Sequence, residues 1–75
     1  MTSEEKVVNA IRSLMGFSGE IRPESHLLDD IGMDSVKLIE LTVALHTQYG
    51  VDLGRRAVQE NMTPETVADL IKLVS

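Results

Sequence analysis

The first apolar pattern in the chain has the spacing of one face of a helix. Its members recur three and four residues apart, as expected for a helix packed on one side. They are Val7, Val8, Ile11, Leu14 and Met15. Thr2 and Glu5 have the spacing of a capping box, in which each side chain bonds the backbone N–H of the other. Gly16 then favours the end of this first helix, because glycine adopts the left-handed conformation that follows many helices.

An irregular stretch follows, from about Phe17 to Met33. It contains the turn-forming residues Gly19, Pro23 and Gly32. Its widely spaced apolar residues are Phe17, Ile21, Leu27, Leu28 and Ile31. A loop of this length without structure is unusual in a small domain. We therefore predict that these side chains pin the loop to the core, and that Ser25–Asp30 forms a short turn of helix.

The strongest helical pattern begins at Asp34 or Ser35 and runs to Tyr49, with Gly50 as its stop. It carries two apolar stripes. We assign the first stripe to the core; it consists of Leu38, Leu41, Leu45 and Tyr49. The second stripe begins beside Ser35 and consists of Val36, Ile39 and Val43. A helix at the edge of a four-helix domain needs only one buried stripe, so the second is either also buried or offered to a partner.

Two further helices are predicted in the remainder of the chain. "VDLGRR" is interpreted as a loop anchored by Leu53, and Arg55–Asn61 as a short helix. Thr63 as N-cap and Pro64 in the first turn indicate the start of the last helix. Its apolar positions are Val67, Leu70, Ile71 and Val74. We predict an all-α fold: a small antiparallel four-helix bundle with three long helices, one short helix and a long first loop, forming a single domain over residues 1–75.

Composition excludes several classes of function. The chain has 75 residues, a formal net charge of −5 and no cysteine. The acidic balance argues against nucleic-acid binding, and the lack of cysteine removes disulfides and thiolate metal sites. No apolar run approaches the roughly 20 residues of a membrane span, and the polar start "MTSEEK" is unlike a targeting segment. We expect a cytoplasmic protein that binds no nucleic acid, membrane or metal.

The pair Asp34-Ser35 stands at the start of the second helix and has two interpretations. Both residue types are common N-caps, so a structural role is the simpler one. A nucleophilic serine needs an activating base, and His46 lies about three turns further along the same helix. His26 is in the loop, and the sequence fixes no orienting acid for it. A chain this short also has little room for a substrate pocket. We predict that the protein is not an enzyme, and that any chemistry at Ser35 depends on another protein.

The stretch "LLDDIGMDSVKLIELTVAL" resembles the acyl carrier protein family. The resemblance extends to the length, the helix order, the long first loop, the "GxDS" that ends at Ser35, and the final "TPETVADLI". It implies that Ser35 receives a 4′-phosphopantetheine arm from coenzyme A. It further implies that Asp34 is contacted by the phosphopantetheinyl transferase that makes this modification. The thiol of the arm would then hold acyl groups as thioesters and deliver them to partner enzymes.

The same resemblance implies a docking surface on the second helix. Val36, Ile39 and Val43 would form the docking stripe around the arm, and Glu40 a polar contact at its rim. The fatty-acid carriers of this family have a second helix rich in acids, whereas the only charged residues from 35 to 49 other than histidine are Lys37 and Glu40. We therefore expect apolar docking with weak dependence on salt. This favours a dedicated pathway, such as those of polyketide or specialised acyl carriers, over general fatty-acid synthesis.

The implied partners are the phosphopantetheinyl transferase, an acyl- or aminoacyl-loading ligase, and downstream synthase or transferase enzymes. We expect the carrier itself to be a monomer. Two alternatives stay open. The first is an aminoacyl or D-alanyl-type carrier loaded by an adenylating ligase, because "NMTPETVADLI" is similar to carriers of that kind. The second is an unmodified helical interaction module that uses the stripe from Val36 to Val43, with Ser35 only a cap.

Overall fold

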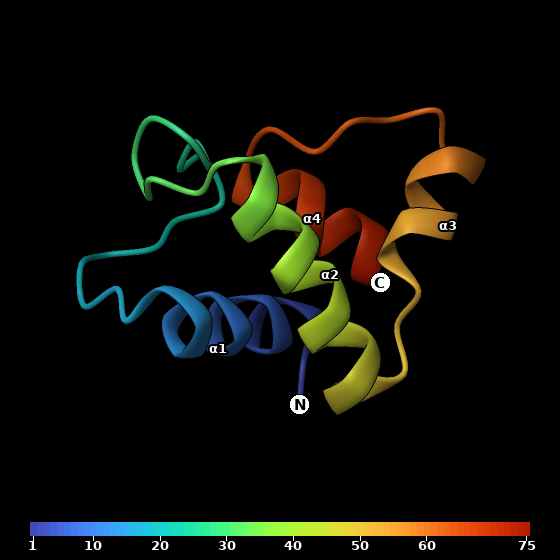
Figure 1. The fold of residues 1–75 in the computed structure, drawn as a ribbon, viewed down its shortest axis with the longest axis horizontal. Coiled ribbons are helices and arrows are strands. Elements are labelled where there is room, and N and C mark those ends of the chain that lie inside the picture. Colours follow the sequence, from blue (N-terminus) through green and yellow to red (C-terminus); the bar gives the residue numbers. More distant parts are fainter.

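Four helices and no strand make up the computed structural model, which describes residues 1–75 (Figure 1). The helices are α1 (Ser3–Met15), α2 (Ser35–Tyr49), α3 (Leu53–Gln59) and α4 (Val67–Val74). Helix α1 packs against α2 and α4, and α3 packs against the same two helices. The predicted small all-α four-helix bundle with a long first loop is therefore confirmed. None of the four helices is long and apolar enough to cross a membrane.

The two long helices have the ends that the sequence predicts. Thr2 and Glu5 form the capping box of α1, each accepting a hydrogen bond from the backbone N–H of the other. Helix α1 is followed by Gly16 at a φ of 62° and α2 by Gly50 at a φ of 70°. A side chain would be strained in that left-handed conformation, which explains why both helices stop at glycine.

Helix α3 begins two residues earlier than predicted. Asp52 caps it by accepting a hydrogen bond from the backbone N–H of Arg55 at 3.0 Å. Leu53 is consequently the first residue of the helix rather than a loop anchor, and it is buried. The helix ends at Gln59 rather than Asn61, which adopts a positive φ of 51° and turns the chain towards α4.

The predicted start of the last helix is wrong. Thr63 is not its cap, because α4 starts at Val67 and is capped by Thr66, which forms a capping box with Asp69. Helix α4 has 8 residues and α3 has 7, so the bundle has two long helices rather than three. Thr63 and Pro64 do not start a helix, because the residues that follow them, 65–67, pair with the first loop.

Backbone hydrogen bonds tie the first loop to the segment before α4. Leu27 N–H donates to the carbonyl of Glu65 at 2.9 Å, and an isolated bridge pairs His26 with Thr66. Val67 N–H donates to the Ser25 carbonyl at 3.0 Å. The loop carbonyl therefore satisfies a donor in the first turn of α4, which has no partner within the helix.

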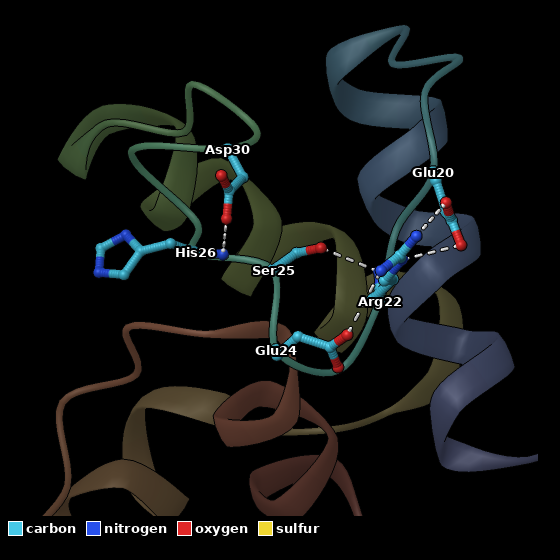
Figure 2. A network of polar contacts seen from close by, with 6 residues as sticks. All are labelled: Glu20, Arg22, Glu24, Ser25, His26 and Asp30. Carbon is cyan, nitrogen blue, oxygen red and sulfur yellow. Dashed lines mark hydrogen bonds and ion pairs between the residues drawn. The ribbon is translucent and has the colours of Figure 1, made fainter.

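Polar contacts order the loop itself, as Figure 2 shows. The Asp30 carboxylate accepts the backbone N–H of His26 at 2.6 Å, and Asp30 N–H donates to the His26 carbonyl at 2.9 Å. The predicted turn near Ser25–Asp30 is thus a hydrogen-bonded turn and not a regular helix. Leu27 and Ile31 are buried as predicted, but Leu28 is 56% exposed and does not pin the loop.

Fourteen apolar side chains form one core, and no polar side chain is buried with them. From α2 the core takes Leu41 and Leu45, while Leu38 and Tyr49 pack half-buried against it. This confirms the predicted core stripe. Met33, at the entry to α2, is also buried, at 3% exposure. Because Met33 is fixed in the core, the residues that follow it are held in place.

The capping box of α4 predicts a dependence of stability on pH. The pKa of Asp69 is held below its ordinary value, mainly by the hydrogen bond from the Glu65 backbone N–H, with further bonds from Thr66. A carboxylate favoured in the folded state stabilises the fold above its unfolded pKa, and this contribution disappears as the pH falls through the lowered folded pKa.

We therefore expect Asp69→Asn to lower the free energy of unfolding by about 0.3–1 kcal/mol at pH 6, because it removes a negative charge from the first turn of α4. The difference from the wild type should shrink towards pH 3 and below, as the wild-type carboxylate becomes protonated. Urea unfolding of both proteins at several pH values measures this. Glu24→Gln, in an exposed ion pair at 3.9 Å, is the control and should change stability by a few tenths of a kcal/mol at most. A difference that stays constant with pH would contradict the prediction.

Candidate phosphopantetheine attachment site

Asp34, and not Ser35, caps helix α2. The Asp34 carboxylate accepts a hydrogen bond from the backbone N–H of Lys37 at 2.9 Å, and its extended backbone precedes the first helical turn. Ser35 is the first residue of the helix and is exposed. The sequence alone did not show which of these two residues is the N-cap. The structure gives the capping role to Asp34, so Ser35 presents a hydroxyl at a helix N-terminus without being needed as the cap.

A sharp turn leads into this position. Gly32 has a φ of 79°, a conformation that residues with a side chain rarely adopt, and its N–H donates to the Leu28 carbonyl at 3.0 Å. Met33 N–H donates to the carbonyl of Leu27 at 2.8 Å. Together with the burial of Met33, these contacts hold the chain immediately before Ser35 against the core.

An open groove of about 400 Å³ lies beside Ser35. The first loop contributes residues 26–28, the entry to α2 contributes 33–35 and Leu38, and the connection between α3 and α4 contributes 63–65. Two of these walls are held together by the hydrogen bond from Leu27 N–H to the Glu65 carbonyl. No local pattern in the sequence indicates that residues 63–65 approach Ser35, because the pairing that brings them there joins segments far apart in the chain.

The second stripe of α2 is exposed. Val36 is 62% exposed, Ile39 65% and Val43 60%. Glu40 is exposed beside them and pairs with Lys37 at 3.2 Å. Apolar side chains in a continuous exposed row indicate a surface for contact with another molecule. Of the two possibilities that the sequence left for this stripe, burial within the chain is wrong, and the stripe is available for contact with a partner.

The surroundings of Ser35 lack the arrangement of a serine nucleophile. His26 lines the same groove, but its Nδ1 accepts the backbone N–H of Asp29 at 3.4 Å and lies 3.7 Å from the Asp29 carboxylate. The hydrogen-bond partners of His26 thus lie in its own turn. His46 is exposed in the last turn of α2, far along the helix from Ser35. No group of three or more histidine and acidic side chains could hold a metal ion.

Comparison with known proteins agrees with this geometry. A family model described as "Phosphopantetheine attachment site" matches residues 5–71. The acyl carrier proteins of Nitratidesulfovibrio vulgaris strains DP4 and Hildenborough are each 32% identical to the chain over 72 residues, which is 95% of both sequences. That of strain Miyazaki F is 30% identical over 73 residues, or 96% of both. The chain therefore belongs to the phosphopantetheine attachment site family.

Proposed function

We propose that this protein is a carrier that holds acyl groups as thioesters on a 4′-phosphopantetheine arm, and that Ser35 bears the arm. The assignment rests on the different roles of two adjacent residues at the start of α2. Asp34 caps the helix, and Ser35 stands exposed beside it with no capping role. Membership of the family supports the carrier function and the cofactor.

The residues around Ser35 suit a covalently attached phosphopantetheine. A phosphodiester on Ser35 would lie at the N-terminus of a helix of 15 residues, where unpaired backbone N–H groups and the helix dipole favour negative charge. When bound, the arm supplies a thiol on a flexible tether, and this chain has no thiol of its own. Ser35 fixes the position of the tether on the bundle, and the open groove beside it leaves room for the first part of the arm.

The neighbouring residues have separate proposed roles. The Asp34 carboxylate is exposed next to Ser35 and is assigned to recognition by the phosphopantetheinyl transferase. Val36, Ile39 and Val43 are assigned to docking of partner enzymes, with Glu40 at the rim. Because Glu40 is paired with Lys37, the stripe carries little net charge. This supports docking that depends on apolar contact more than on salt-sensitive attraction.

Family membership implies contact with a phosphopantetheinyl transferase and with acyl-handling enzymes, and carriers of this family are in general not catalysts. The finer assignments remain predictions from the sequence: a monomeric carrier of a dedicated pathway in the cytoplasm, loaded by an acyl or aminoacyl ligase. The exposed stripe on α2 also suits an unmodified interaction module, which the experiment below distinguishes from a carrier.

The absence of cysteine allows a simple test. We expect the purified, unmodified chain to show no thiol by titration with Ellman's reagent. After incubation with coenzyme A, magnesium and a broad-specificity transferase, and removal of the remaining coenzyme A, it should show about one thiol per chain. An acyl adenylate should then transfer its acyl group to the new thiol, with release of AMP and a proton, and the thiol should lose its reactivity with the reagent. A folded chain that gains no thiol, while a control carrier does, would favour the unmodified interaction module.

A further inference from the structure

Leu28 is an exposed apolar side chain that the exposed stripe of α2 does not include. It lies in the first loop, is 56% exposed, and lines the same groove as Ser35. Its neighbour Leu27 is 4% exposed and belongs to the core. The loop therefore anchors itself through Leu27 and leaves the next side chain at the surface, beside the proposed attachment residue.

The backbone around Leu28 is well held. The Leu28 carbonyl accepts the Gly32 N–H at 3.0 Å, and Leu27 N–H is bound to the Glu65 carbonyl. Asp30 and the ion-paired Arg22 order the segment before it, as Figure 2 shows. A contact made by Leu28 would thus cost little ordering of the loop, which favours a role in recognition.

We propose that Leu28 is a second docking element for the phosphopantetheinyl transferase, separate from α2. The inference rests on the proposed modification of Ser35. An enzyme that reaches the Ser35 hydroxyl must cover the surface around it, and Leu28 forms one side of the groove while Val36 adjoins Ser35 on the helix. The complementary surface of the transferase is apolar at this point, because the apolar side chains Leu28 and Leu38 and also Pro64 line the groove.

The chain offers a matched control. Val58 in α3 is 81% exposed, and the groove that it lines does not include Ser35. Loss of an apolar side chain at position 58 therefore reproduces the change in surface composition and leaves Leu28, Leu38 and Ser35 unchanged. Leu28→Ser and Val58→Ser are the test and control, Leu28→Met is the conservative rescue, and Leu28→Gln is a second test variant that retains more of the side-chain volume.

The experiment measures kcat and KM for phosphopantetheinylation by a broad-specificity transferase, and the Kd of each unmodified chain for that transferase by calorimetry. We expect Leu28→Ser and Leu28→Gln to raise KM and Kd about tenfold, an effect expected for loss of a buried interface contact, with kcat changed less than about twofold. Val58→Ser and Leu28→Met should match the wild type. Circular dichroism checks that each variant is folded.

The outcomes separate the two proposals. If the wild type is modified and both Leu28 test variants behave like Val58→Ser, the role of Leu28 is wrong while the proposed function stands. A fall in kcat at unchanged KM and Kd would also overturn it, because that result assigns Leu28 to the chemical step rather than to docking. If the folded wild type is not modified at all, the proposed function fails, and the docking role fails with it.

Discussion

Replacing Ser35 with alanine is expected to abolish modification while leaving the fold intact. The proposed attachment atom is lost, whereas the cap of α2 is kept because Asp34, and not Ser35, accepts the Lys37 N–H. Alanine has the highest intrinsic helix propensity, so stability should be unchanged or rise by about 0.5 kcal/mol. Intact-protein mass after incubation with transferase and coenzyme A, together with thermal unfolding, measures both effects.

Asp34→Ala is the matched control for this experiment. It removes the cap and should lower stability by about 0.5–2 kcal/mol, but the hydroxyl at Ser35 remains. It should therefore weaken modification without eliminating it. If Ser35→Ala destabilised the chain and Asp34→Ala did not, the division of roles at the start of α2 would be wrong.

Leu45→Ala is expected to unfold much of the protein. Leu45 is 0% exposed on the core face of α2, and truncation of such a core residue costs about 2–5 kcal/mol. A single small core of this kind provides only roughly 3–5 kcal/mol in total. The variant should therefore be marginal at best, with a greatly lowered midpoint in urea unfolding.

Val43→Ala, two residues earlier on the same helix, is the control for Leu45→Ala. Val43 is 60% exposed on the docking stripe, so its truncation should change stability by about 0.5 kcal/mol or less. Any effect of this substitution should appear as weaker binding to partner enzymes. Equal destabilisation by the two substitutions would show that the docking stripe also carries the fold, which would remove the basis for assigning it to partners.

Local signals in the sequence were sufficient for the two long helices. The ends of α1 and α2 depend on caps within a few residues, such as the Thr2–Glu5 box and the glycine after each helix. The start of α4 was mispredicted because two local signals competed. Thr63 and Pro64 have the form of a helix start, but Thr66 and Asp69 form the actual capping box. Hydrogen bonds from the distant first loop decide between them, and no local pattern reports such bonds.

The site, like the fold, could be predicted only where local sequence patterns determine it. Resemblance to a family singled out Ser35 and Asp34, and periodicity identified the stripe that contains Ile39. Periodicity could not tell whether that stripe is buried, because an apolar row has the same spacing against a core or in solvent. Leu28 was expected to pin the loop together with Leu27 and Ile31, because all three are apolar. Only the path of the backbone places Leu28 at the surface beside Ser35.

The measurement that tests the central claim most directly is the intact mass of the wild-type chain after incubation with coenzyme A, magnesium and a transferase, followed by fragmentation to locate the added group. We predict a gain equal to one phosphopantetheine, carried by the fragment that contains Ser35, and a hydroxyl free of modification at every other serine and threonine. A gain located at a different residue, or no gain in a folded chain under conditions that modify a control carrier, would contradict the account.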